Sequence, residues 1–143
     1  MDFNNKKESQ EPISEVIHSD CFSQWLGADG LLYAVSEKGS KLTFETAKGH
    51  TKALEQLTKG KKYPLLVDLK EMHSASKEAR DYLSRDQESI GKIQAVALLI
   101  QSPVSRIIGT FFLGLNKPLS LPVKMFTDKE KAQEWLKGFR DES

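Results

Sequence analysis

Ala95-Val96-Ala97-Leu98-Leu99-Ile100 is the most hydrophobic run in this chain of 143 residues. An uninterrupted apolar run of this kind is typical of a strand buried on both faces of a sheet. Pro64-Leu65-Leu66-Val67-Asp68-Leu69 is a second such run, and Pro122-Val123-Lys124-Met125-Phe126 predicts a third strand. Fully buried strands need helices on both faces of their sheet, so these runs predict an α/β protein.

Four helices are predicted around these strands. The first covers Thr43 to Thr58, and Gly60 follows it where a C-terminal cap belongs. The second begins at Ser74 or Ser76, whose hydroxyl can accept a hydrogen bond from a free N–H at a helix start. The third begins at Ser102-Pro103, because proline at the first helical position loses no hydrogen bond, and it runs to about residue 115.

The fourth helix follows Thr127-Asp128-Lys129-Glu130, which has the pattern of a capping box. The apolar stripe behind this box contains Ala132, Trp135, Leu136 and Phe139. This spacing predicts that Trp135 is fully buried and closes the core.

The N-terminal part predicts a hairpin. Cys21 to Leu26 and Leu31 to Val35 are two short runs, and Gly27-Ala28-Asp29-Gly30 between them supplies the turn. Residues 1–12 are polar and are expected to form a flexible arm, and residues 13–143 a single domain. The order β-β-α-β-α-β-α-β-α predicts a mostly parallel sheet with right-handed crossovers and an antiparallel hairpin at one side.

Composition excludes several functions. Lys and Arg number 21 against 20 Asp and Glu, and this net charge of +1 gives no field that would hold a nucleic acid. No run approaches a membrane span and the first residues do not form a signal peptide, so we expect a cytoplasmic protein without stable membrane insertion. The single cysteine, Cys21, excludes an internal disulfide and predicts a buried, inert thiol.

Three segments resemble uncharacterised bacterial proteins of the SpoIIAA-like (STAS/SEC14-domain-like) family. They are residues 60–69, residues 105–113, and residues 123–128 leading into Glu134-Trp135-Leu136. The resemblance spans roughly Phe22 to Phe139 and implies a STAS-like fold without an agreed activity. In better understood STAS domains, a serine at the start of the helix after the Asp-containing strand is phosphorylated. The matching stretch, Asp68 to Ser76, has His73-Ser74-Ala75-Ser76 in place of the usual Asp-Ser-Ser-Gly.

Asp68, Arg106, Ser74 and Ser76 are the candidate ligand- or anion-binding residues. Asp68 lies near the carboxyl end of a buried strand, the edge at which open α/β sheets bind ligands. Arg106 lies in the first turn of the third helix, at the wrong end of the helix dipole for a cation. An anionic partner is therefore expected, either a carboxylate such as Asp68 in an ordinary ion pair or a bound anion. Ser74 and Ser76 are expected to be helix caps, and a phosphate there would also meet the positive end of a dipole.

No catalytic group, cofactor or metal site is expected. His18, His50 and His73 are scattered over different elements and offer no two-ligand spacing on one helix. Each is expected to be a surface histidine or one with its hydrogen bonds satisfied.

The third helix is apolar nearly all round. At 100° per residue its main stripe consists of Val104, Ile107, Ile108, Phe111 and Leu115. That stripe is expected to face the sheet, which leaves Phe112 at its margin and Leu113 on the opposite side. Phe112 and Leu113 are therefore the candidate interface residues.

Three functions remain open from the sequence. The first is a non-enzymatic interaction or regulatory domain that binds a protein partner and forms a homo-oligomer. The second is a SEC14-like carrier of a lipid or apolar small molecule, gated by the third helix. The third, an enzyme that uses Asp68 and Arg106, has the least support, because acid–base chemistry needs a partner group that the sequence does not reveal.

Overall fold

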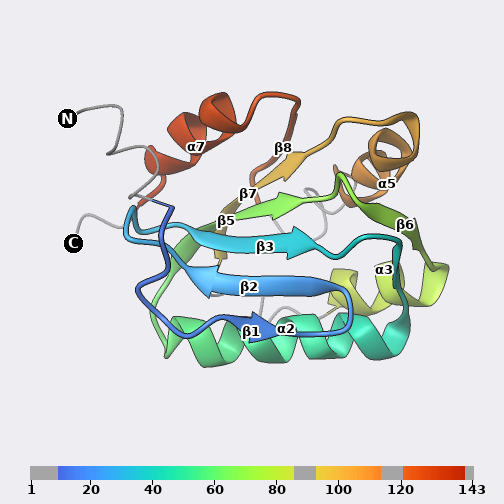
Figure 1. The fold of residues 1–143 in the computed structure, drawn as a ribbon, viewed down its shortest axis with the longest axis horizontal. Coiled ribbons are helices and arrows are strands. Elements are labelled where there is room, and N and C mark those ends of the chain that lie inside the picture. The colour runs from blue at the N-terminus through green and yellow to red at the C-terminus, as the bar shows by residue number, and fades with distance from the viewer. Residues whose placement is uncertain (1–9, 86–92, 114–120, 141–143) are drawn as a thin grey trace.

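The computed structural model describes residues 10–85, 93–113 and 121–140 (Figure 1). These residues form a main sheet with the strand order β1-β2-β3-β5-β7-β8. The strands are β1 (Ile17–His18), β2 (Phe22–Leu26), β3 (Leu32–Ser36), β5 (Tyr63–Asp68), β7 (Ile93–Leu99) and β8 (Val123–Phe126). β1, β2 and β3 pair antiparallel, and β3 also begins the parallel part of the sheet, which continues through β5, β7 and β8. The predicted mostly parallel sheet with an antiparallel hairpin at one side is confirmed.

Helices cover both faces of this sheet. They are α2 (Phe44–Thr58), α3 (Lys77–Arg85), α5 (Pro103–Leu113) and α7 (Lys129–Lys137). The side chains of α2, α3 and α5 join the apolar cluster on one face, whereas α7 packs on the other face (Figure 1). The apolar runs that predicted buried strands therefore have helices above and below them.

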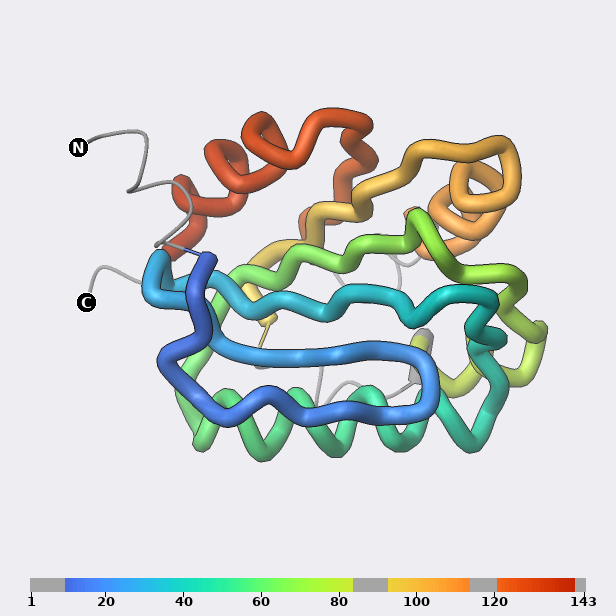
Figure 2. Tube along the Cα trace, in the orientation of Figure 1, coloured from blue at the N-terminus to red at the C-terminus, as the bar shows by residue number. Residues whose placement is uncertain are grey.

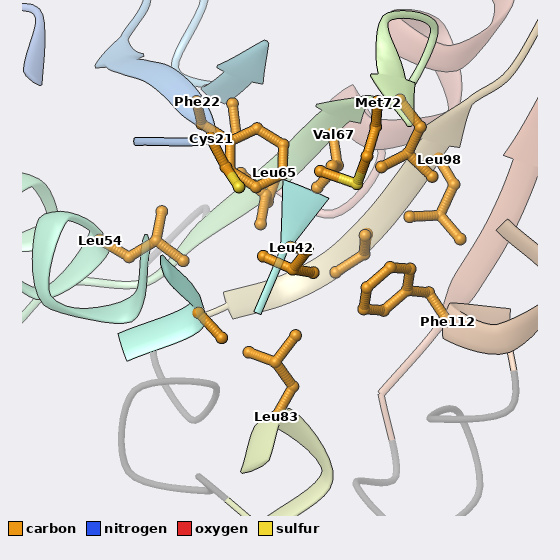
Figure 3. Packing of buried hydrophobic residues seen from close by; sticks show 14 of the residues in the cluster. Cys21, Phe22, Leu42, Leu54, Leu65, Val67, Met72, Leu83, Leu98 and Phe112 are labelled. Atoms are coloured by element: carbon orange, nitrogen blue, oxygen red, sulfur yellow. The ribbon is translucent and has the colours of Figure 1, made fainter. Parts of the chain in front are cut away.

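Alternation along each strand divides the core into two clusters. Tyr33 pairs in register with Leu66, and Leu66 with Ala97, and all three side chains lie under α7. Their sequence neighbours point to the opposite face and form the larger cluster with α2, α3 and α5 (Figure 3). Strict alternation follows from the two-residue period of a strand.

Three short strands were not predicted: β1, which adds an antiparallel edge to the hairpin, and a pair of strands outside the main sheet. β4 (Ser40–Leu42) and β6 (Met72–Ala75) form a separate two-stranded parallel sheet. In Figure 2 the chain leaves β3 (cyan) and β5 (green) at the same end of these two parallel strands, and the segments that follow them therefore lie close together. Three- and four-residue strands with polar residues carry no periodic signal long enough to identify them.

Helix α5 presents a different face to the core from the one predicted. Its buried residues are Ser105, Ile108, Gly109 and Phe112, whereas Val104, Ile107 and Phe111 are exposed, and residue 115 lies outside the described residues. Gly109 explains this orientation: a Cβ atom there would lie 2.9 Å from the sulfur of Met125 and 3.1 Å from a methyl carbon of Ile100. The helix thus approaches the sheet closely at its small residues; Val104, Ile107 and Phe111 of the predicted stripe turn outward, whereas Ile108 stays in the core.

Two details of α7 also differ from expectation. The N-cap is Asp128, whose carboxylate accepts hydrogen bonds from the backbone N–H of Glu130 and Lys131, so the predicted box is shifted by one residue from Thr127. Leu136 is fully buried, whereas Trp135 is half-buried and packs its ring against Phe126 and Phe139.

The predicted N-terminal arm, residues 1–12, falls mostly outside the described residues. Its last part is attached to the hairpin: the Trp25 indole donates to the carbonyl of Gln10, and the N–H of Ala28 donates to that of Glu11. Residues 10–12 are therefore held against the domain instead of forming part of a loose arm.

Candidate functional site

Asp68 lies at the end of β5, on the sheet face covered by α7, and is 8% exposed. Its carboxylate accepts a hydrogen bond from the backbone N–H of Lys70 at 2.9 Å and lies 3.6 Å from the Lys70 ammonium. Lys129, at the start of α7, lies near enough to Asp68 for the two charges to interact. Burial nevertheless lowers the pKa of the Lys129 ammonium, and the Asp68 carboxylate opposes this shift only in part. Lys70 thus neutralises Asp68 within the fold, as expected of an ordinary ion pair.

Asp68 is not the carboxylate partner of Arg106, one of the two alternatives for that residue. Arg106 is exposed on α5 and forms no ion pair with a described residue. Lys70 pairs with Asp68, because the turn after β5 brings its ammonium back to the carboxylate. Binding of an anion by Arg106 stays a prediction.

Ser74 and Ser76 have different roles. The Ser76 hydroxyl accepts a hydrogen bond from the backbone N–H of Ala79 at 3.1 Å, which confirms it as the cap of α3. Ser74 lies within β6, where it pairs with Lys41 of β4. The four candidate ligand-binding residues therefore occupy β5, β6, the start of α3 and α5, and no contact between their side chains joins them into one site among the described residues.

The outer face of α5 carries three exposed apolar side chains. Val104 is 45% exposed, Ile107 59% and Phe111 39%. Their spacing of three and four residues places them along one stripe of the helix. The guanidinium of Arg80, on α3, lies over the ring of Phe111, 4.0 Å from its centre, so α3 borders the stripe. We call Val104, Ile107 and Phe111 the α5 stripe.

The residues predicted to form the interface lie elsewhere on this helix. Phe112 is 8% exposed and belongs to the core, and Leu113 is half-buried. The sequence analysis assigned the inner and outer faces from the helical spacing of the apolar residues. The small residues Ser105 and Gly109 are the signal that would have placed the α5 stripe outside.

A cavity of about 60 Å³ lies inside the larger core cluster. Its described wall contains one polar side chain, His50 of α2, and the apolar residues Phe22, Leu42, Leu65, Val67, Leu69, Leu83, Val96, Leu98, Phe112, Leu121 and Val123. Figure 3 shows Leu42, Leu83 and Phe112 facing one another across this part of the core.

His50 was expected to be a surface histidine or a satisfied one, and it is neither. It is 7% exposed, and its Nδ1 has no hydrogen-bond partner among the described residues. Its ring centre lies 4.8 Å from that of Phe22, and burial lowers its pKa to about 4. The signal was its place on α2, three residues after Ala47 and four before Leu54, both buried.

Within the described ranges, no three side chains of His, Cys, Asp or Glu come close enough together to hold a metal ion. None of the described helices has the length and apolar character that a membrane span requires. The Cys21 thiol is buried and donates to the carbonyl of Lys41, and burial raises its pKa.

The comparisons with known proteins agree on the fold. The model of the family described as Domain of unknown function (DUF7793) matches residues 24–140. An uncharacterised protein of the DUF3478 family from Shewanella loihica PV-4, with a SpoIIAA-like fold, is 25% identical; the match covers 87% of this chain and 98% of that one, with a TM-score of 0.58. An anti-sigma factor antagonist from Mycobacterium paratuberculosis is 18% identical over 76% of this chain and 86% of that one, with a TM-score of 0.54. No curated protein matches the chain. The SpoIIAA-like fold implied by the sequence resemblance is confirmed.

Proposed function

The chain belongs to the family described as Domain of unknown function (DUF7793), and we propose that it is a non-catalytic interaction domain that associates with a second copy of itself through the α5 stripe. The observation that carries this proposal is the exposure of three large apolar side chains in one row. Single exposed apolar residues are ordinary on a protein surface, whereas a contiguous row indicates a contact surface.

The apolar area of the α5 stripe determines how stable a dimer we expect. Complete burial of one such side chain contributes ~1.5–3 kcal/mol, and each of the three is already partly buried. Association costs an estimated ~4–15 kcal/mol of lost freedom, so the stripe alone supports only a weak dimer. Neighbouring surface of α3, next to Arg80, would have to add to the contact.

A second copy fits the charge of the chain. The net charge of +1 means that two copies repel each other little over a long range. A twofold axis through the α5 stripe would place apolar side chains against apolar side chains, as a dimer between identical surfaces requires. The mycobacterial neighbour is an anti-sigma factor antagonist, by its name a protein that acts on another protein, and this agrees with an interaction role.

Sedimentation over a concentration series tests the proposal. The wild type is expected to show a reversible dimer at high micromolar concentrations, and Ile107→Asp is expected to weaken it at least tenfold because a charge would be buried in the contact. Thr110→Asp is the matched control, since it places the same charge on an exposed position of the same helix, outside the stripe. A wild type that stays monomeric, or equal weakening by both substitutions, would reject the stripe as the contact.

Lipid carriage, the alternative from the sequence, has less support. The cavity of about 60 Å³ is less than half of the ~150 Å³ that accommodates benzene in an engineered protein core. A lipid chain is much longer than benzene. The described cavity therefore favours a much smaller occupant.

A further inference from the structure

The cavity in the larger core cluster combines two features that packing alone leaves unexplained. It is a space of about 60 Å³ between the sheet and the helices α2, α3 and α5 (Figure 3). Protein interiors are normally close-packed, with few voids larger than a water molecule. The wall also includes His50, whose buried Nδ1 lacks a hydrogen-bond partner among the described residues.

The unpartnered nitrogen of His50 is costly for the empty protein. Leaving a buried polar atom without a hydrogen bond forfeits the interaction that it had with water in the unfolded chain. His50 stays neutral near pH 7 because burial lowers its pKa to about 4. In a neutral ring, Nδ1 is a donor or an acceptor according to the tautomer. A hydroxyl group suits both cases, because it can accept from Nδ1 or donate to it.

Other occupants fit the described wall less well. An ion would lose its hydration with no charged side chain in that wall to compensate. A single water would find one polar partner there, whereas buried waters make about three hydrogen bonds. A purely apolar molecule would fill the space and leave Nδ1 unpartnered.

We propose that this cavity binds one small, uncharged, mostly apolar molecule with a hydroxyl group, which forms a hydrogen bond with His50 while its carbon atoms contact the leucine, valine and phenylalanine side chains. A core cavity of ~150 Å³ accommodates benzene, so a volume of about 60 Å³ leaves room for roughly two or three non-hydrogen atoms. Ethanol has this size and chemistry. This site is separate from the α5 stripe, whose residues are exposed and do not belong to the cavity wall.

Methyl NMR of the full chain, labelled with ¹³C at leucine and valine, tests this proposal with ethanol and xenon as probes. Both are expected to give saturable shifts at wall methyl groups such as those of Leu65, Leu83 and Val96. His50→Leu, which keeps the size of the side chain and removes its polar atoms, is expected to weaken ethanol binding about two- to twelve-fold. Xenon binding is expected to be unchanged in this variant, because it depends only on contact with the walls.

Ser40→Ala is the matched control. The Ser40 hydroxyl is also buried and unpartnered among the described residues, but it is not part of the cavity wall. This substitution is expected to leave the binding of both probes unchanged, while a dispersed methyl spectrum shows that each variant is folded. Absence of saturable shifts with both probes would overturn the site. Ethanol binding that is equally strong in His50→Leu, or equally weakened by Ser40→Ala, would overturn the role of His50.

Discussion

The hydroxyl of Tyr33 donates a hydrogen bond to the carboxylate of Asp29 beneath α7. Tyr33 is fully buried, and Asp29, in the turn between β2 and β3, is 7% exposed. Gln133 of α7 donates to the same hydroxyl at 2.8 Å, and Arg140 donates to the Asp29 carbonyl at 3.0 Å. Burial raises the pKa of Tyr33, and the hydrogen bond to Asp29 raises it further. This network connects the hairpin turn and the sheet to the helix that covers this face.

Tyr33→Phe should lower the free energy of unfolding by ~1.5–3 kcal/mol, because it leaves the buried Asp29 carboxylate and the Gln133 amide without their shared partner. Tyr63→Phe removes the same group from a half-buried tyrosine whose hydroxyl bonds to no described residue, and should change stability by less than ~0.5 kcal/mol. Urea denaturation of the two variants measures the contrast. Equal losses would show that the network does not stabilise the fold.

The strands were predictable because their signal is local. The apolar run from Ala95 to Ile100 contains most of β7, and Gly27 to Gly30 marks the turn of the hairpin. These patterns depend on neighbours in the sequence, which is why five strands of the main sheet and the four helices could be derived from the chain alone, whereas the two-residue strand β1 could not. The small sheet of β4 and β6 could not, since it pairs two short segments that are far apart in the sequence and that follow the paired strands β3 and β5.

The candidate site was less predictable because it depends on which face of a helix approaches the sheet. Gly109 permits a close contact with Met125, and this contact turns Ile107 and Phe111 outward. Sequence spacing gave the correct helix and the wrong face. His50 shows the same difficulty: its place on the inner side of α2 could be inferred from its neighbours, but its unpartnered nitrogen is a property of the packed core.

Asp128→Ala should destabilise the protein by ~1 kcal/mol, since the Asp128 carboxylate accepts hydrogen bonds from two backbone N–H groups at the start of α7. Thr127→Ala is the control, because Thr127 is the cap that the sequence predicts and is not the cap in the structure. Thermal and urea unfolding of both variants distinguish the two assignments. A larger loss for Thr127→Ala would restore the sequence-based assignment.

The pH dependence of stability should reveal the burial of His50. Its pKa is about 4 in the folded protein, against 6.5 for an unperturbed histidine. Between these values the unfolded chain binds a proton that the folded protein does not, so the free energy of unfolding falls as the pH falls from about 6.5 to about 4. A shift of this size corresponds to a loss of roughly 3 kcal/mol across the window, with no further change from this group below pH 4.

His50→Leu should remove this contribution, and the difference in unfolding free energy between wild type and variant isolates it from other groups. His18 and His73 are present in both proteins, so the effects of their titration on stability cancel in the difference. No titratable side chain other than His50 belongs to the described wall of the cavity. The wild type should lose stability relative to His50→Leu as the pH falls from 6.5 to 4. Urea denaturation of both proteins at steps of about half a pH unit measures this difference. A difference that stays constant with pH would mean that His50 takes up a proton as readily in the folded protein as in the unfolded chain.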